Sequence, residues 1–235
     1  MIKASARGCG GGFFYRICIF IKEAPLKYTH LFWDFNGTIF SDMQAGIDAV
    51  NKMLDERGIP IIPDMETYRE IFDFPIKEYY RNLGFDFERE PYEVLAPIWV
   101  DLYLKNCCDA GIVDGVDTVV RTVARTEMKQ VILSACEKNM LCDQLSELGV
   151  IEYFDEIIGL DDIHAAGKLH LAQAWREKHP EAKILFVGDT VHDAETAEVL
   201  GADCLLFTGG HQSKARLLAT GCKTIDQMTE ILDHI

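Results

Sequence analysis

The chain has few of the features that mark secreted and nucleic-acid-binding proteins. Its eight cysteines include no CxxC pair, and several lie in apolar or helical stretches, so the sequence predicts reduced thiols rather than a disulfide framework or a zinc site. Basic residues are scarce, because 23 Lys and Arg stand against 38 Asp and Glu, a net charge of −15. This charge would repel a nucleic-acid backbone, and a small anionic substrate would need a local cation or metal ion to be held.

Long hydrophobic runs, internal repeats and low-complexity segments are also missing. The stretch FFYRICIFI at 13–21 is interrupted by Arg16 and is not followed by a small-x-small cleavage pattern. It is also too short to cross a bilayer. We expect residues 1–26 to form a disordered tail, as an upstream start codon would produce. The sequence therefore predicts a cytoplasmic protein, monomeric or homodimeric, with no membrane or nucleic-acid partner.

Apolar runs alternate with helical patterns along most of the 235 residues, a length that fits one domain or one domain with an insert. This alternation predicts an α/β fold, a Rossmann-like parallel sheet with helices on both faces. The expected strands are 28–34, 129–134, 155–159, 183–188 and 203–207. The expected helices are 42–57, 115–127, 138–148, 168–178, 193–200 and 212–220.

The stretch from 43 to 112 interrupts the alternation, since all of it has helical spacing with prolines at the boundaries. A helical insert between the first and second strands would lie over the C-terminal edge of the sheet, where open α/β sheets bind ligands. We therefore predict a core of 27–42 and 113–235 and an α-helical cap of 43–112 that closes on substrate. The alternative is an independent helical module without a catalytic role.

Four segments carry residues suited to phosphoryl transfer. LFWDFNGT (31–38) places Asp34 at the end of an apolar strand, where a buried carboxylate without a partner would cost several kcal/mol. VILSA (131–135), Lys168 and LFVGDTVHD (185–193) add a hydroxyl, a cation and two more carboxylates. Each feature alone also has a structural explanation: Asp34 could cap a turn, Lys168 could be solvated, and the last segment could end in an Asp N-cap. Their combination favours a site.

The chemistry of these residue types suggests a role for each. Asp34 could attack phosphorus and form an aspartyl-phosphate that water hydrolyses. Asp189, Asp34 and a backbone carbonyl could bind Mg²⁺, which prefers hard oxygen ligands, while Asp193 ligates through water or orients Lys168. The phosphate oxygens would be held by Lys168, by the hydroxyls of Thr38 and Ser134, and by the backbone amides of Asn36, Gly37 and Ala135.

The order DxxGT, SA after an apolar run, Lys and GDxxxD resembles the haloacid dehalogenase-like hydrolase superfamily. The likeness covers about 28–233 and is greatest to the phosphoglycolate-phosphatase-like branch, which has a helical cap between the first and second motifs. It implies a Rossmann-like core with a mobile cap and Asp34 as the nucleophile. It also implies that Asp189 and Asp193 serve a Mg²⁺ ion and that Ser134 and Lys168 are the second- and third-motif residues.

The chain departs from this family at Asn36, where phosphatases of the family have an Asp that protonates the leaving group and later activates water. An amide cannot transfer that proton, and such help is worth roughly 10²–10⁴ in rate. The family uses this residue's backbone carbonyl for the metal, so that ligand is retained. Three explanations stay open: substrates with good leaving groups such as acyl or aryl phosphates, replacement by another acid such as His192, or a ligand-binding protein with little turnover.

We therefore predict a Mg²⁺-dependent phosphatase for a small phosphorylated metabolite, with Asp34, Asn36 and Lys168 as catalytic residues. Phosphoglycolate is suggested by the family likeness alone. A dehalogenase is less favoured because it needs no Mg²⁺. A phosphonate-cleaving relative would need a desolvated cap lysine, and the candidates sit among other charges. Those candidates are Lys52, Lys77 and Lys105. In the cap, Tyr79, Tyr80, Arg81 and Trp99 could face substrate, although most aromatics are expected to pack the cap core.

Overall fold

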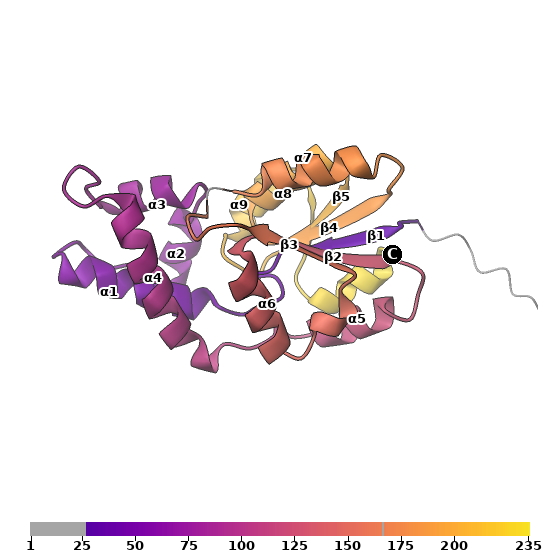
Figure 1. Cartoon of the computed structure of the whole chain (residues 1–235), viewed down its shortest axis with the longest axis horizontal. Coiled ribbons are helices and arrows are strands. Elements are labelled where there is room, and N and C mark those ends of the chain that lie inside the picture. The colour runs from indigo at the N-terminus through magenta and orange to yellow at the C-terminus, as the bar shows by residue number, and fades with distance from the viewer. Residues whose placement is uncertain (1–26, 166) are drawn as a thin grey trace, which may run out of the picture.

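The computed structural model describes residues 27–165 and 167–235, so the tail predicted for 1–26 lies outside the described residues. Six parallel strands form one sheet in the order β3-β2-β1-β4-β5-β6, and their C-terminal ends point toward the cap helices (Figure 1). The strands are β1 (His30–Trp33), β2 (Lys129–Glu137), β3 (Glu156–Leu160), β4 (Ile184–Gly188), β5 (Asp203–Phe207) and β6 (Lys223–Ile225).

Helices cover both faces of the sheet, as predicted (Figure 1). Side chains alternate along each strand, so Leu31 and Trp33 enter one apolar core and Phe32 enters the other. The first core is covered by α5 (Val116–Val123), α6 (Lys138–Glu147) and the 3₁₀ helix η3 (Met228–Asp233). The second is covered by α7 (Leu169–Lys178) and α8 (Val191–Leu200), and α9 (Lys214–Ala219) precedes β6. Short 3₁₀ turns η1 (Cys107–Asp109) and η2 (Ile151–Tyr153) complete the connections.

The insert between β1 and β2 is helical, which confirms the predicted architecture. It consists of α1 (Met43–Glu56), α2 (Met65–Ile71), α3 (Ile76–Leu83) and α4 (Tyr92–Asn106), which share their own apolar core. The two connections to the sheet run side by side. The Ser41 amide donates to Gly111 O (2.8 Å), the Val113 amide donates to Ile39 O (2.8 Å), and Phe40 pairs with Ile112. The exact boundaries at 43 and 112 stay a prediction.

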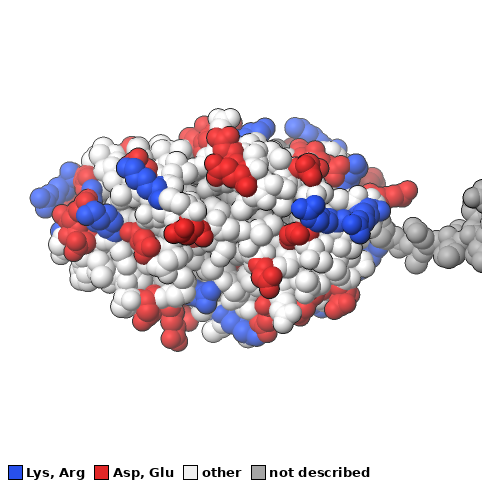
Figure 2. Space-filling view, turned by 90° about the horizontal axis from the view of Figure 1, so that it is seen from below, with Lys and Arg blue, Asp and Glu red and all other residues white. Residues whose placement is uncertain are grey.

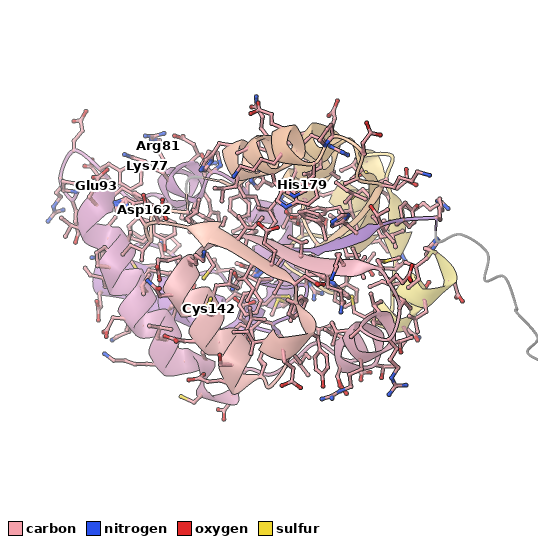
Figure 3. All side chains as sticks on the ribbon, turned by 45° about the vertical axis from the view of Figure 1, so that its right-hand side comes forward. Lys77, Arg81, Glu93, Cys142, Asp162 and His179 are labelled. Carbon is pink, nitrogen blue, oxygen red and sulfur yellow. The ribbon has the colours of Figure 1, made fainter. Side chains whose placement is uncertain are left out.

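Polar contacts hold the cap against the C-terminal edge of the sheet. Arg69 of α2 donates from Nε to Gly210 O (2.8 Å) and from Nη2 to Gly209 O (2.7 Å), both in the loop after β5. On the opposite side, the Tyr92 hydroxyl donates to His164 O (2.8 Å). Figure 3 shows the neighbouring Asp162 at the cap side of the core. The cap is therefore docked over the ends of the strands.

The structure differs from the predicted elements at two places in the sheet. Strand β2 continues to Glu137 rather than ending at 134, because a register shift after Leu133 lets Glu137 pair again with Leu160. Strand β6 was not predicted, since three residues are too few to show an alternating pattern. In the part of the chain that is described, no helix has both the length and the apolar character of a bilayer span. On the face shown in Figure 2, basic and acidic side chains are interspersed without a continuous basic stripe.

Candidate active site

Three acidic side chains meet where β1 and β4 end. The parallel register pairs Trp33 with Val187, so the residues just beyond the two strands, Asp34 and Asp189, become neighbours. Asp193 follows within the first turn of α8. One carboxylate oxygen of each lies within 4.8 Å of the others, and all three residues are buried. The acids selected from the first and fourth motifs are therefore one cluster.

Lys168 lies at the start of α7 and is buried among these acids, with 1% of its surface exposed. Its Nζ lies 2.7 Å from Asp193 Oδ1 and forms a second ion pair with Asp34. The alternative interpretation that Lys168 is solvated is therefore wrong. One ammonium group links the predicted nucleophile, Asp34, to the second acid of the fourth motif, Asp193.

Asp193 contacts Lys168 and also takes part in the start of α8, where the N-cap is Thr190 rather than an Asp. Its Oδ2 accepts hydrogen bonds from the Asp189 amide (3.0 Å), the Thr190 amide (2.9 Å) and the Thr190 hydroxyl (2.7 Å). The bond from the Thr190 amide is one half of a capping box at the start of α8, and the Asp193 amide completes it by donating to the Thr190 hydroxyl (3.3 Å), with Thr190 as the N-cap. The other oxygen of Asp193 contacts Lys168. The local helix start therefore fixes the carboxylate that orients the lysine.

The charges of this cluster do not balance. Burial and the nearby Asp193 raise the pKa of Asp34 well above its ordinary value, although Lys168 acts in the opposite direction. Burial likewise raises the pKa of Asp189 to about 6. Burial lowers the pKa of Lys168, but the two carboxylates outweigh it and raise that pKa to about 12. The Lys168 ammonium group thus pairs with Asp34 and Asp193, and the third carboxylate, Asp189, has no ion pair with it.

This donor set fits a divalent cation. Clustered carboxylate oxygens at the mouth of a sheet are hard ligands of the kind that Mg²⁺ prefers, and a doubly charged ion would offset the excess negative charge. The same ion would favour the ionised forms of Asp34 and Asp189. The fit rests on Asp34, Asp189 and Asp193. The ligand role of the Asn36 carbonyl remains a prediction.

Glycines let the backbone approach these acids closely. A Cβ atom on Gly210 would lie 2.2 Å from Asp189 Oδ2, and one on Gly37 would lie 2.4 Å from the same oxygen. Gly37 also has a φ of +74°, a backbone conformation that residues with a Cβ atom rarely adopt. At Gly188, a Cβ would lie 2.3 Å from Asp193 Cγ. Both acids of the fourth motif are therefore enclosed by backbone.

Of the residues predicted to hold phosphate, all but Thr38 and Gly37 line a cavity of about 50 Å³. Ser134, Ala135 and Lys168 line it together with Asp34. Ser134 Oγ accepts a hydrogen bond from the Cys136 amide (3.0 Å), whereas the Thr38 hydroxyl donates to Asp189 Oδ1 (2.9 Å). Thr38 therefore supports a carboxylate in this structure. The phosphate roles of these residues stay predictions.

The side chain of Asn36 is held by two neighbours. Its Nδ2 donates to Asp42 Oδ2 (2.7 Å) and to the Tyr103 hydroxyl (3.0 Å). The Tyr103 hydroxyl donates to the same Asp42 oxygen (2.8 Å), and the Gly37 amide donates to Asp42 Oδ1 (3.0 Å). Both amide hydrogens of Asn36 are thus engaged. Asp42 is an acidic residue of the site that sequence reasoning missed, because nothing in FSD marks it as different from a surface aspartate.

His211 is a second residue that sequence reasoning missed. Its Nε2 lies 3.4 Å from Asp42 Oδ1, and its Nδ1 shares a hydrogen bond with the Tyr68 hydroxyl (2.7 Å). Burial disfavours the charged ring, but Asp42 outweighs it and raises the pKa of His211 to about 9. Its backbone amide donates to Asp189 Oδ2 (2.6 Å). The available signal was its position in GGHQS, directly after a strand that ends at the same sheet edge.

His192, considered as a replacement acid, lies in the wall of the small cavity. Its Nε2 accepts from the Lys168 amide (3.3 Å), its Nδ1 lies 3.3 Å from Glu195, and its ring stacks on Phe74. Burial lowers its pKa. Both ring nitrogens thus have protein partners. The cap lysines considered for Schiff-base chemistry are on the surface, each beside an acid: Lys52 with Glu56, Lys77 with Glu93, and Lys105 with Asp101.

Comparison with known proteins agrees with this arrangement. A family model described as haloacid dehalogenase-like hydrolase matches residues 31–207. The chain belongs to this family. No curated protein matches the chain.

Solved structures share the fold. A haloacid dehalogenase-like hydrolase from Streptococcus pneumoniae has a TM-score of 0.76 at 19% identity, covering 88% of this chain and 98% of that one. A predicted phosphoglycolate phosphatase from Haemophilus somnus has a TM-score of 0.72 at 14% identity, covering 90% and 99%. A structure of Protein Tyrosine Kinase A from Mycobacterium tuberculosis has a TM-score of 0.72 at 18% identity, covering 88% and 97%. Because these names differ in activity, the similarity establishes the fold with its helical cap.

Proposed function

We propose that this protein is a Mg²⁺-dependent phosphatase that acts on a small phosphorylated metabolite through an aspartyl-phosphate on Asp34. The observation that carries the proposal is the buried cluster of three carboxylates at the C-terminal edge of the sheet, two of which pair with Lys168. Bound Mg²⁺ would supply positive charge that neutralises the phosphoryl oxygens. The likeness to structures named as phosphoglycolate phosphatases adds phosphoglycolate as a candidate substrate.

The protein residues divide the reaction between them. An Asp34 carboxylate oxygen attacks phosphorus as the bond to the leaving oxygen breaks, and that oxygen departs with the bonding electrons. Lys168, held by Asp193, stabilises the charge on the phosphoryl group. Ser134 and Ala135 line the small cavity beside Asp34, and we infer that the Ser134 hydroxyl and the Ala135 amide bind phosphoryl oxygens. Water then attacks phosphorus as the bond to the Asp34 oxygen breaks; the electron pair of that bond returns to the Asp34 carboxylate, and the proton lost by the water passes to solvent, because Asn36 cannot accept it.

Asn36 limits which leaving groups are accessible. Its amide hydrogens are engaged by Asp42 and Tyr103, and an amide cannot donate a proton as a carboxylic acid does. The missing assistance, roughly 10²–10⁴ in rate, matters least when the leaving oxygen is already a weak base. We therefore favour acyl or aryl phosphates over alkyl phosphates as substrates.

The second candidate is a protein that binds a phosphorylated metabolite with little turnover. It is favoured by the same Asn36 contacts, which leave the position of the usual acid occupied by a group that cannot titrate. Such a protein would hold the ligand through Lys168 and the loop amides and release no phosphate over hours.

Phosphate release from phosphorylated metabolites, with and without Mg²⁺, distinguishes the two. A phosphatase should show multiple turnovers that stop when EDTA removes the metal. Mass spectrometry of acid-quenched protein during turnover should show a phosphoryl adduct on the peptide that contains Asp34. Absence of the adduct during turnover would disprove the covalent route, and ligand-dependent stabilisation without release would favour the binding protein.

Magnesium should also bind in the absence of substrate. At one hundred times its Kd, the ion should stabilise the fold by about 2.7 kcal/mol, which corresponds to a rise in Tm of about 5–10 °C for a chain of this size. The same titration on Asp189→Asn should give little shift, since it removes a carboxylate of the cluster. An equal shift in both proteins would contradict the assigned metal site.

A further inference from the structure

A second cavity adjoins the phosphate cavity on the cap side. It measures about 120 Å³ and shares Asn36, Phe72, Phe74 and His211 with the smaller one. A group attached to a phosphoryl group in the small cavity would therefore extend into this space. Its volume is close to the roughly 150 Å³ of an engineered apolar cavity that holds one benzene ring.

Aromatic and aliphatic side chains dominate its walls. Helices α2 and α3 and the turn between them contribute Tyr68, Phe72, Phe74, Tyr79 and Tyr80, and α4 contributes Trp99. The prediction that most cap aromatics pack the cap core holds for Tyr79 and Tyr80, which are buried there while also facing the cavity. Arg81 lies outside the lining, on the surface beside Glu78.

The charges around the cavity are unsuited to a second anionic group. The Asp, Glu and His residues of its lining are Asp42, Glu137 and His211, and His211 is paired with Asp42. Among the described residues, neither Lys nor Arg contributes to the lining. Since Asp42 and His211 offset each other's charge, a carboxylate such as that of glycolate would meet the remaining acid of the lining, Glu137, and no Lys or Arg, which disfavours it. An uncharged ring would meet aromatic faces and edges.

A buried hydroxyl also points to a ligand. Tyr79 is 3% exposed and lines the cavity, and its hydroxyl has no hydrogen-bond partner among the described residues. Buried polar groups are nearly always hydrogen-bonded. A cavity wall is a place where a bound molecule or ordered water can satisfy such a group.

We propose that the cap cavity binds an aromatic ring, and that the substrates are phosphate monoesters with an aryl leaving group. This inference rests on the proposed phosphatase activity and adds the identity of the leaving group. An aryl oxide is a weak base, with a phenol pKa near 10, whereas an alkoxide resembles hydroxide, whose conjugate acid has a pKa of about 15.7. The aryl oxygen leaves with the electron pair of the broken bond and takes its proton from bulk water. A cavity that binds a ring and the lack of a proton donor at position 36 thus both favour aryl phosphates.

Four substrates distinguish the effect of an aromatic ring from the effect of a good leaving group. Phenyl phosphate has both a ring and a good leaving group, benzyl phosphate has only the ring, acetyl phosphate has only the leaving group, and phosphoglycolate has neither. We expect the two ring substrates to have KM values about tenfold below those of the other two, and phenyl and acetyl phosphate to have the higher kcat values. Turnover with no ring dependence of KM, or with phosphoglycolate preferred, would overturn the inference and leave the phosphatase proposal intact.

Binding decides the inference even if no substrate turns over. Calorimetry with Mg²⁺ should give phenylphosphonate a Kd at least about tenfold below that of methylphosphonate. Equal affinities would overturn the ring site. Absence of phosphate release together with this difference would reject the phosphatase proposal and retain the ring site.

Gly46 provides a variant that fills the cavity. It lies in α1 and lines the cavity, and a Cβ there would have Trp99 Cζ2 as its nearest neighbour, at 3.9 Å. The Cβ of Gly46→Leu therefore has room, the rest of the side chain adds volume at the cavity wall, and the change replaces glycine inside a helix with a better helix former. We expect the phenylphosphonate preference over methylphosphonate to fall about tenfold. Gly111→Leu is the control, because a Cβ there meets nothing within 4 Å and its φ is not positive. An unchanged preference in the folded Gly46 variant would overturn the inference.

Discussion

The core half of the site and its cap half differ in what they are made of and how they are held. The core contributes charges, namely three carboxylates and Lys168, fixed by the ends of strands and by the capping box of α8. The cap contributes aromatic rings, packed in a separate apolar core and docked through contacts such as that of Arg69 with Gly210 O. With the proposed function, this difference implies that the core carries out the reaction and the cap recognises the leaving group. Changes in the core should lower kcat, and changes in the cap should alter KM.

The largest effect is expected at Asp34. Asp34→Asn removes the attacking carboxylate while keeping its size, so kcat should fall at least about 10³-fold, as for other catalytic nucleophiles. The measurement is steady-state phosphate release with Mg²⁺. Asp143→Asn, on the exposed face of α6, should keep the activity of the parent. Comparable kcat in the two variants would remove the nucleophile assignment and the division of labour with it.

A smaller loss is expected from one methyl group in the core. Gly210→Ala places a Cβ 2.2 Å from Asp189 Oδ2, so the carboxylate or the loop must move. We expect Mg²⁺ affinity to fall about 10–100-fold, the usual range for residues that support a metal ligand. Gly111→Ala has no nearby atom and serves as control. Unchanged Mg²⁺ affinity in the thermal-shift titration would show that backbone enclosure does not position Asp189.

The boundary between core and cap can be tested by exchanging Asn36 and Asp42. Asn36→Asp alone places two carboxyl groups where Nδ2 and Oδ2 now lie 2.7 Å apart. Repulsion between two carboxylates should make the pair share one proton, which is then held between them rather than given to the leaving oxygen. Combining Asn36→Asp with Asp42→Asn restores a donor beside an acceptor. We expect the double variant to hydrolyse benzyl phosphate about tenfold faster than the single variant. Equal rates would show that Asp42 does not govern the chemistry at position 36.

The smallest effect concerns the cap alone. Tyr79→Phe removes a buried hydroxyl that has no partner among the described residues and keeps the ring. Without ligand, the free energy of unfolding should stay equal or rise by up to about 1 kcal/mol, because an unsatisfied polar group is lost. Chemical denaturation measures this change. A marked loss of stability would reveal a hydrogen bond of that hydroxyl in solution and would weaken the case for a ligand there.

Much of the fold and the charged cluster could be predicted from the sequence because they depend on short-range patterns. Apolar runs that end in Asp34 and Asp189 place those acids at one sheet edge once the strands are parallel. Strand β6 and the extension of β2 have no such pattern. The contacts of Asp42 and His211 depend on loops whose paths are set by tertiary packing, so the sequence gives only their positions in the chain.

The cap was harder to predict for a related reason. Helical spacing indicates which side chains are apolar, but the same pattern describes a filled core and a wall with a hollow behind it. Tyr79 and Tyr80 do both. Only the relative placement of α2, α3 and α4 separates the two cases, and that placement is decided by contacts far apart in sequence.

The close fit of Gly37, Gly188 and Gly210 around the acids of the fourth motif has a practical consequence for altering this protein. The backbone around Asp189 and Asp193 has little room for added atoms, so libraries that vary these glycines should return mostly inactive clones. The wall of the cap cavity contains positions such as Gly46, where a Cβ can be added without a collision. New substrate preferences should therefore be sought by mutating the cap cavity while the carboxylate cluster is left unchanged.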